Sequence, residues 1–508
     1  MKSINLFIAL SLLCIPMTAQ KLKYPDTKKV DQVDTYFGTK VSDPYRWLED
    51  DRAAEVEKWV TEENSVTFGY LDKIPFRKQV KARLEEFVNY PRYSNPFKRG
   101  EYYYFYKNDG LQNQSVLYRQ KGLNGEVELF LDPNLLSSDG TVALHGINFS
   151  RDNKYAAYEI SRSGSDWQEI RVMETATRKI LPDSIAWNKF SGASWFGNGF
   201  FYSRYDEPKN TDKAYSEKNT FHKVYYHKLG TPQIQDELAF QDSSELLFFS
   251  VNATDDERFL FLYKSGKAKG NALWFKDVKA GDKDFRPLME SMDYEFGVID
   301  NADDKIFIQS NFEAANSNII MIDSKSPERK NWKTIIPEKE YPLSFSSIVG
   351  DKIIVGYAKD VKIIVNVFDL AGNFENEIPL PTAGTASGFG GMRSDKETFY
   401  TFTSFTYPST VYRYEIPEKK TTLFRKSELK FNPDEFETKQ VFYPSKDGTK
   451  IPMYIVYKKG LKLDGNNPTL LYAYGGFNVS LNPAFSALRL GWLEQGGIYA
   501  QANLRGGN

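Results

Sequence analysis

A short apolar or aromatic segment recurs along the middle of this chain at a nearly regular interval. Its copies begin at Tyr102, Tyr155, Phe200, Phe259, Ile306, Ile353 and Phe399, which places successive copies 45 to 59 residues apart. A second segment of the same kind follows each copy, and these begin at Val116, Ile170, Val224, Leu273, Ile319, Val365 and Val411. A pair of strands repeated about every fifty residues is typical of a β-propeller, because a small sheet cannot bury both faces alone and has to stack on copies of itself. The seven copies predict a propeller of seven blades.

Polar turns precede most of these copies and support the same interpretation. Such turns stand at Arg151–Lys154, Asp255–Arg258, Asp303–Lys305 and Gly350–Lys352. Asp, Asn and Gly are common where a strand reverses, because they tolerate turn conformations or bond to their own backbone. A large irregular β-sandwich is the alternative, but it would not keep so even a period.

The composition fits a large β protein and argues against a nucleic-acid partner. Aromatic residues make up 15% of the 508 residues, and flat rings suit the pleated surface of a sheet. Lys and Arg number 66 against 67 Asp and Glu, so no basic field is available to attract DNA or RNA. A chain of this length exceeds one ordinary domain, so two or more are expected.

The three histidines of the chain, His145, His222 and His227, do not suggest a metal site. His222 and His227 lie five positions apart, and on a strand an odd separation places two side chains on opposite faces. We therefore interpret all three as structural residues. Neither a metal ion nor an organic cofactor is expected.

The first nineteen residues have the pattern of a secretory signal peptide. Lys2 supplies the positive start, and Leu6–Ile15 form an apolar run too short to span a bilayer. Met17-Thr18-Ala19 places a small residue at the cleavage point, so the mature chain is expected to begin at Gln20.

Cys14 is the only cysteine, so a mature chain that has lost it forms neither disulfides nor thiolate metal sites. Lipidation of Cys14 is not expected, because the bulky Leu12 and Leu13 precede it where a lipoprotein has small residues. No later segment approaches the length of a transmembrane helix. We expect a soluble, periplasmic monomer without membrane contact once the signal is removed.

Different patterns flank the repeats. Before them, Ala53–Ile74 and Lys78–Asn89 are predicted as helices. After them come two alternating strands (Thr438–Tyr443 and Ile451–Tyr457), a continuous apolar strand of the buried type (Pro468–Tyr474), a helix (Ala484–Glu494) and another buried strand (Gly496–Asn503).

The order hairpin, strand, helix, strand is how the sheet of an α/β-hydrolase begins. The predicted fold class is therefore mixed β and α/β, a seven-bladed propeller joined to the N-terminal portion of an α/β-hydrolase domain. The expected divisions are a signal peptide (1–19), an N-terminal helical segment that packs on the hydrolase part (20–75), the propeller (76–430) and the incomplete hydrolase domain (431–508).

The segment Tyr474-Gly475-Gly476-Phe477 follows the first buried strand and is a candidate for catalytic work. In α/β-hydrolases the loop after an early central strand contributes to the oxyanion hole, where a donor must approach a carbonyl oxygen as it gains charge. Two glycines allow unusual backbone angles there, and a tyrosine hydroxyl can donate a hydrogen bond. The alternative is an ordinary turn at a strand end beside a core tyrosine.

Three segments together resemble the prolyl oligopeptidase family. They are Asp43-Pro44-Tyr45-Arg46-Trp47-Leu48-Glu49, Tyr472-Ala473-Tyr474-Gly475-Gly476-Phe477-Asn478 and Ala502-Asn503-Leu504-Arg505-Gly506-Gly507, and the likeness runs from about Tyr24 to Asn508. The resemblance implies cleavage of short peptides on the carboxyl side of proline, behind a propeller that excludes folded proteins. It also implies that Tyr474 is the oxyanion-hole tyrosine and that Phe477 lines the substrate pocket near the proline.

The catalytic triad that the resemblance implies is absent from these residues. No Gly-x-Ser-x-Gly occurs, since Gly192-Ala193-Ser194 continues into Trp195-Phe196, and all three histidines precede the hydrolase part. The family's Ser, Asp and His follow the Asn503–Gly507 motif. We therefore expect a C-terminally incomplete, inactive chain in which residues 436–508 are poorly ordered or prone to aggregate. Two alternatives stay open: a secreted binding propeller with a relic tail, and a related oligopeptidase that prefers basic residues.

Overall fold

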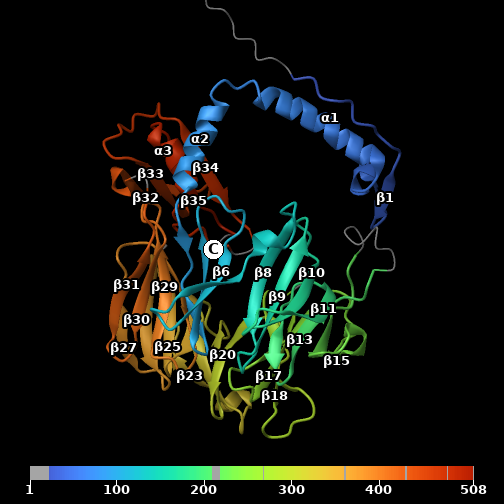
Figure 1. The fold of residues 1–508 in the computed structure, drawn as a ribbon, viewed down its shortest axis with the longest axis vertical. Coiled ribbons are helices and arrows are strands. Elements are labelled where there is room, and N and C mark those ends of the chain that lie inside the picture. Colours follow the sequence, from blue (N-terminus) through green and yellow to red (C-terminus); the bar gives the residue numbers. More distant parts are fainter. Residues whose placement is uncertain are drawn as a thin grey trace, which may run out of the picture. The chain divides into compact units, whose positions relative to one another are not determined.

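The computed structural model describes residues 22–208, 218–266, 268–359, 362–429, 432–476 and 479–506. It divides into two compact units, residues 1–80 with 212–216 and residues 81–211 with 217–508. The predicted signal peptide lies outside the described residues. In the first unit, β1 (Val33–Tyr36) pairs antiparallel with β2 (Thr39–Ser42), and α1 (Ala54–Leu71) follows (Figure 1). This helix confirms the one predicted over residues 53–74.

The second unit begins within α2 (Arg77–Val88) and continues into six successive antiparallel sheets. The first has five strands: β3 (Arg92–Tyr93), β4 (Phe97–Arg99), β5 (Tyr102–Asn108), β6 (Val116–Lys121) and β7 (Val127–Leu131). The second has eight: β8 (Val142–Phe149), β9 (Tyr155–Arg162), β10 (Gln168–Glu174), β11 (Ile180–Asn188), β12 (Ser194–Phe196), β13 (Gly199–Arg204), β14 (Lys223–Lys228) and β15 (Glu237–Phe240).

Four sheets of four strands each follow. They are β16 (Phe248–Ala253), β17 (Phe259–Ser265), β18 (Asn271–Asp277) and β19 (Arg286–Met289); β20 (Phe296–Ala302), β21 (Lys305–Ser310), β22 (Asn318–Asp323) and β23 (Lys333–Ile336); β24 (Leu343–Val349), β25 (Lys352–Lys359), β26 (Lys362–Asp369) and β27 (Phe374–Ile378); β28 (Thr385–Gly390), β29 (Glu397–Thr403), β30 (Thr410–Glu415) and β31 (Lys420–Lys426).

The repeated segments of the sequence are the central strands of these sheets. The fourteen predicted starting points fall within the pairs β5–β6, β9–β10, β13–β14, β17–β18, β21–β22, β25–β26 and β29–β30. The predicted polar turns reverse the chain before β9, β17, β21 and β25, and in them Asn153, Glu257, Asp303 and Asp351 have φ values of 49° to 58°. The predicted strand repeat and its turn residues are therefore confirmed.

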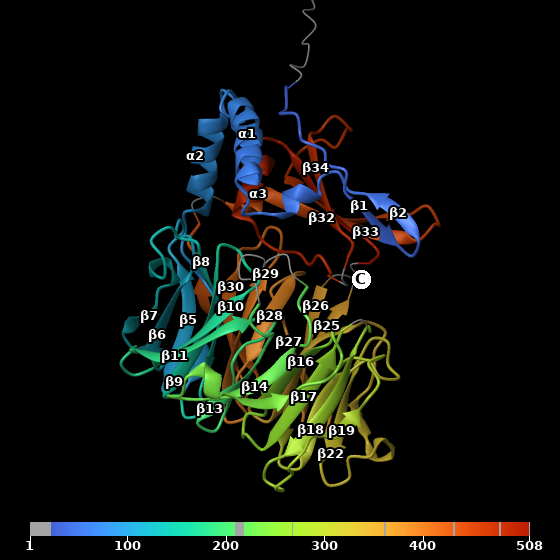
Figure 2. The same cartoon turned by 90° about the vertical axis from the view of Figure 1, so that its right-hand side faces the viewer.

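Neighbouring sheets stack through apolar side chains. One buried cluster, for example, joins β17 and β18 to β21 and β22 and includes Phe259, Phe261, Leu273, Ile306 and Ile308. Strand β12 of the eight-stranded sheet contacts both β8, the first strand of that sheet, and β16, the first strand of the next sheet, and the first strands β20, β24 and β28 contact each other in series. These strands therefore lie on the inside of the stack, as expected around the axis of a propeller (Figure 2).

Side chains close the ring where the first sheet meets the last. The rings of Tyr103 in β5 and Phe399 in β29 are 6.0 Å apart and nearly perpendicular, and the Tyr103 hydroxyl donates to Glu397 at 2.5 Å. The guanidinium of Arg425 stacks 3.9 Å from the Phe105 ring. Lys98 forms an ion pair of 3.3 Å with Asp395. No strand is shared between these two sheets, so their contact rests on side chains alone.

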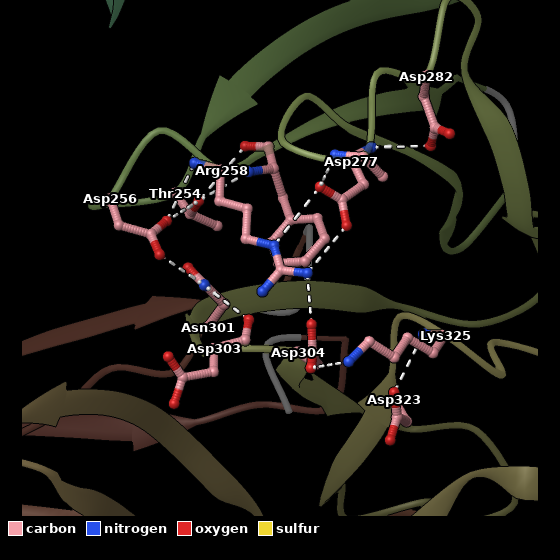
Figure 3. A network of polar contacts seen from close by, with 12 residues as sticks. Thr254, Asp256, Arg258, Asp277, Asp282, Asn301, Asp303, Asp304, Asp323 and Lys325 are labelled. Carbon is pink, nitrogen blue, oxygen red and sulfur yellow. Dashed lines mark hydrogen bonds and ion pairs between the residues drawn. The ribbon is translucent and has the colours of Figure 1, made fainter.

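A polar network joins the sheet β16–β19 to the sheet β20–β23 (Figure 3). Arg258 binds Asp277 of its own sheet at 3.0 Å and Asp304 of the next sheet at 2.5 Å. Lys325 also binds Asp304, at 2.6 Å, while Asn301 donates to Asp256 at 2.9 Å. The bonds from Lys325 and then from Arg258 lower the pKa of Asp304 to about 2.

The C-terminal segment forms a separate mixed sheet of four strands. In spatial order these are β32 (Phe436–Pro444), β33 (Lys450–Lys458), β35 (Ile498–Asn503) and β34 (Thr469–Tyr474), and only β34 and β35 run parallel. Helix α3 (Ala487–Glu494) packs against α2 at Gly491, where a β-carbon would lie 2.6 Å from Leu84. Arg83 binds Glu494 through two nitrogens, at 2.6 and 3.0 Å.

The prediction that residues 468–474 form a buried strand is wrong in one respect. The strand exists as β34, but all six of its residues are exposed, including Leu470 and Leu471. Strand β34 lies at the edge of the sheet with β35 as its only partner, and the described residues do not cover its faces. An apolar run of this type is typical of a parallel strand that is covered on both faces. The described residues do not provide that cover for β34.

We predict that Phe399→Ala opens the junction between the first and last sheets. The ring is buried between Tyr103 and Phe424, so its loss should lower the free energy of unfolding by about 3–5 kcal/mol. Thermal unfolding followed by circular dichroism measures this loss. Leu423→Ala in β31 of the same sheet is the matched control, because Leu423 is exposed and its truncation should change stability by no more than about 0.5 kcal/mol. Equal effects of the two variants would contradict the role given to this junction.

We predict that Asp304→Asn lowers the melting temperature in a pH-dependent way. A carboxylate whose pKa is depressed in the folded protein adds stability above its ordinary value near 3.8, and that stability disappears as pH falls toward about 2. Wild type and variant should therefore differ at pH 7 and converge near pH 2. The neighbouring Asp303→Asn serves as control, since Asp303 is exposed and has no cation within 4 Å among the described residues. A difference that does not change between pH 7 and pH 2 would contradict the assignment.

Candidate functional site

The candidate site lies where the two parallel strands of the C-terminal sheet end side by side. Tyr474, the last residue of β34, pairs in register with Asn503, the last residue of β35. Open α/β sheets bind ligands outside the carboxyl ends of their parallel strands. The two loops that leave these ends, Gly475-Gly476 and Leu504-Arg505-Gly506, therefore form the edge at which a substrate would be expected.

These two loops approach each other closely, and Gly506 has no room for a side chain. A β-carbon on Gly506 would lie 2.6 Å from the carbonyl oxygen of Gly475, and Gly506 also has a φ of +90°. A β-carbon on Gly475 would lie 3.1 Å from the carbonyl oxygen of Arg505. Arg505 in turn binds Asp447 at 2.5 Å and Ser445 at 3.0 Å, which ties its loop to the turn between β32 and β33.

Tyr474 presents its phenol at this edge. Its side chain is 40% exposed, and its hydroxyl lies 4.0 Å from the position that a β-carbon of Gly476 would occupy. Among the residues that the structure describes, none accepts or donates a hydrogen bond at this hydroxyl. The group is therefore available to donate to a ligand. Phe477, the second residue predicted for the site, lies outside the described residues.

Two amide side chains of β35 hold the segment that follows the tyrosine loop. Asn503 and Gln501 both donate to the carbonyl oxygen of Leu481, at 3.1 and 3.0 Å. Tyr499 donates to Gln501 at 3.0 Å. Sequence reasoning missed these positioning residues. The signal was present, because polar amides at alternate positions of an otherwise apolar strand point to the same face.

The histidines do not take part in this site. His145 bonds to Ser161 at 2.7 Å in the second sheet, and the buried His222 accepts from the amide of Phe249 at 3.0 Å. Burial lowers the pKa of His222 to about 4, so its imidazole is neutral at physiological pH. Within the described ranges, no group of three or more His, Cys, Asp or Glu side chains could hold a metal ion.

His227 is fully buried between two aspartates. It lies 2.7 Å from Asp236 through Nδ1 and 3.0 Å from Asp183 through Nε2, and Asp236 also accepts from the Tyr202 hydroxyl. Burial alone would lower the pKa of His227, but the bonds to Asp236 and Asp183 outweigh it and the net pKa is raised. The arrangement joins β11, β13 and β14, so this histidine has a structural role in the second sheet.

Tyr474 and its two glycines can stabilise charge but cannot start a reaction. A phenol and the backbone amides of a strand-end loop are suitable donors to an oxyanion. Attack on an amide by serine also needs a base within hydrogen-bond reach of the hydroxyl. The described residues place no histidine or other base beside a serine at this edge, so the site contains only the electrostatic part of such chemistry.

Comparison with known proteins relates the propeller and the C-terminal sheet to the same group of proteins. Residues 25–427 match the family model described as the prolyl oligopeptidase N-terminal β-propeller domain. A prolyl endopeptidase of Elizabethkingia miricola is 45% identical over 491 residues, which cover 96% of this chain and 69% of that protein. Prolyl oligopeptidase A of Amanita bisporigera is 33% identical over 531 residues, with 95% and 69% covered.

Solved structures show the same similarity. A prolyl endopeptidase studied for its inter-domain dynamics superposes with a TM-score of 0.89 at 33% identity, over 95% of this chain and 72% of that one. Prolyl oligopeptidase B from Galerina marginata, bound to a 25-residue macrocyclization substrate, gives a TM-score of 0.88 at 30% identity, over 96% and 72%.

We predict that Gly506→Ala disturbs the tyrosine loop. The added methyl group would meet the Gly475 carbonyl, so the two strand ends have to separate, and the amides of residues 470–476 should exchange with deuterium faster. Gly448→Ala is a matched control, because Gly448 also has a positive φ of 85° but faces open space. Its effect should stay within the turn at residues 445–449. Unchanged exchange at residues 470–476 in Gly506→Ala would contradict the close approach of the two loops.

Proposed function

The chain belongs to the prolyl oligopeptidase family, and on this basis we propose that the protein is a serine-type endopeptidase that cleaves short peptides on the carboxyl side of proline. The observation that carries the proposal is the unpartnered Tyr474 hydroxyl at the carboxyl end of a parallel strand. Its position at that edge suits a group that meets a substrate carbonyl. The family relationship supplies the reaction class.

In this proposal Tyr474 donates its hydroxyl proton in a hydrogen bond to the carbonyl oxygen of the scissile peptide. That oxygen gains negative charge as the tetrahedral intermediate forms, so a bond made there is stronger in the transition state than in the ground state. Gly475, Gly506 and the amides of Asn503 and Gln501 hold the loop in place. The assignment of Phe477 to the wall of the proline pocket rests on family resemblance.

We also propose that residues 20–508 alone do not hydrolyse peptides. Their sequence has no Gly-x-Ser-x-Gly, and no histidine follows the start of the C-terminal sheet. An oxyanion donor without a nucleophile retains little of the rate of such an enzyme. A binding function for the propeller is the second candidate, and it is favoured by this same lack of a nucleophile.

For the propeller we propose seven blades that restrict access to the active site. In the eight-stranded sheet, β11 and β13 share a single pair of residues, Asn188 and Arg204, and a buried apolar cluster lies between the two halves. Counting the halves as two blades gives seven units, six of four strands and one of five, in agreement with the period of the sequence. A narrow central channel would admit short peptides and exclude folded proteins.

Export to the periplasm as a monomer is likewise our proposal, and it rests on the signal-like residues 1–19. In the part of the chain that the structure describes, no helix combines the length and hydropathy that crossing a bilayer would need. The balanced charge of the chain supports short peptides as partners rather than nucleic acid.

Hydrolysis of a blocked peptide with proline before a chromogenic reporter tests the function. We expect no turnover by the 508-residue chain and turnover by a C-terminally extended product that spans the full length of its relatives. In that product, Tyr474→Phe should lower kcat by about 10²–10³ with little change in KM, because only the transition-state bond is lost. A substrate with arginine in place of proline is the control for specificity. Preference for arginine, or an unchanged kcat in Tyr474→Phe, would contradict the proposal.

A further inference from the structure

A buried polar cluster joins the two halves of the eight-stranded sheet. The first half comprises β8–β11 and the second β12–β15, and β11 shares only one pair of residues with β13. His227 of β14 lies 3.0 Å through Nε2 from Asp183 of β11, and 2.7 Å through Nδ1 from Asp236, which follows the short helix η4 (Gln233–Gln235). The three side chains are at most 1% exposed, so the contact between the halves is closed to bulk water.

The contacts of His227 require a proton on each of its ring nitrogens. An ionised carboxylate only accepts hydrogen bonds, and a neutral imidazole has one N–H and one lone pair. With a single ring proton, one of the two nitrogens would therefore face a carboxylate oxygen with no hydrogen between them. Two ring protons satisfy both contacts, and the resulting imidazolium supplies a positive charge to carboxylates that are costly to bury without one.

Other donors hold both carboxylates in their ionised form. The backbone amide of Gly230 donates at 2.6 Å to the same oxygen of Asp183 that contacts His227. The hydroxyl of Tyr202 donates to the second oxygen of Asp236 at 2.7 Å. Hydrogen bonds to the charged form of a group favour that form, so the additional proton of the cluster belongs to the imidazole and not to a carboxyl group.

His227 is the only positively charged group that pairs with these two carboxylates in the part of the chain that the structure describes. Burial, and then the bond to Asp236, raise the pKa of Tyr202, so its hydroxyl stays protonated at alkaline pH; the charge of Arg204 on the same strand opposes this rise only in part. Burial alone would lower the pKa of His227, but its bonds to Asp236 and Asp183 outweigh burial and raise it. The imidazole is therefore the group of this cluster that titrates first as pH rises.

The bonds that join β11 to the second half converge on this cluster. Asp183 accepts from both His227 and Gly230, and Gln233 exchanges two hydrogen bonds of 3.0 Å with the backbone of Ala186. The second oxygen of Asp183 is buried and has no hydrogen-bond partner among the described residues. Loss of the second ring proton would leave this carboxylate buried with one amide as its donor, which favours opening of the junction.

We propose that His227 is a pH-dependent switch between the two halves of the sheet: its imidazolium holds β11 to β14, and loss of one ring proton at alkaline pH releases Asp183 and loosens the junction. A histidine whose pKa is higher in the folded protein than its ordinary value of about 6.5 contributes stability that is complete below that value. This stability is lost as pH rises through the pKa of the folded protein. The switch is independent of the proposed peptidase function.

Nuclear magnetic resonance of the 508-residue chain, labelled with nitrogen-15 in its histidine rings, tests the number of ring protons. At pH 7 we expect protons on both ring nitrogens of His227, and loss of one of them at higher pH. His222 is the internal comparison, because it is also buried but its Nδ1 accepts from the Phe249 amide, so it should carry one proton. His145→Gln and His222→Gln assign the signals by removing one each. A single ring proton on His227 at pH 7 would overturn the proposal.

Hydrogen exchange between pH 6 and pH 10, followed by mass spectrometry, tests the loosening of the junction. After correction for the intrinsic effect of pH on exchange, residues 180–188 and 228–236 should lose protection by about tenfold or more, which corresponds to the loss of one hydrogen bond to a charged group. Residues 305–323, which contain β21 and β22 of another sheet, should keep their protection. Unchanged protection at 180–188 and 228–236, or an equal loss in all three segments, would overturn the proposal.

Asp183→Asn and His227→Gln should both remove this pH dependence. Asparagine offers an amide proton to Nε2, so a neutral ring satisfies both of its contacts, and glutamine has no group that titrates. His145→Gln is the matched control, because His145 bonds to Ser161 in the same sheet and has no carboxylate partner among the described residues. It should leave the pH dependence unchanged.

The same pH dependence in Asp183→Asn as in the wild type would overturn the assignment. The ring measurement leaves the cluster intact, so it decides the proposal even if Asp183→Asn and His227→Gln fail to fold. No hydrolysis is measured, so failure here is distinct from failure of the proposed peptidase function.

Discussion

The fold depends on how the first and last sheets of the propeller meet. Each sheet buries its faces only against its neighbours, so the stack is stable only if its two ends also cover each other. Tyr103 and Phe399 make that contact, together with Arg425 stacked on Phe105. The buried part of this cluster is Tyr103, Phe399 and Val411, the smallest of the clusters between sheets. Because the two sheets share no strand, this junction relies on side chains.

A different constraint shapes the C-terminal sheet. Its two parallel strands end together, and glycines at 475 and 506 let their loops touch through the backbone. That contact fixes Tyr474 at the edge of the sheet, where no described residue forms a hydrogen bond with its hydroxyl. The exposed apolar side chains of β34 belong to the same edge, so the strand that carries the tyrosine is also the least covered strand of the sheet. An edge of this kind is prone to pair with other chains unless something covers it.

Local pattern was enough to predict the strands but not their partners across the molecule. The repeat located the central strands of every propeller sheet, because alternation and turn residues are properties of neighbouring positions. The junction of Tyr103 with Phe399 joins residues far apart in the chain, and nothing in either segment indicates the other. Residues 468–474 were expected to be buried because their composition resembles that of a strand covered on both faces. Whether a strand is buried depends instead on which other segments pack against it.

The candidate functional residues also differ in whether the sequence alone indicates them. Tyr474 could be proposed from the sequence because a tyrosine and two glycines at a strand end have a direct chemical meaning. The role of Asn503 in holding Leu481 depends on how a loop folds back. A contact of this kind is a property of three-dimensional surroundings, so the sequence alone does not show it.

On the proposal above, these 508 residues supply the access route and one oxyanion donor of a serine peptidase, but not the attacking group. Covalent labelling with an organophosphonate serine probe, read by mass spectrometry of the intact chain, tests this most directly. The account predicts no labelling of the folded 508-residue chain under conditions that fully label an active serine peptidase. Stoichiometric modification of a single serine, abolished by unfolding the chain, would contradict it.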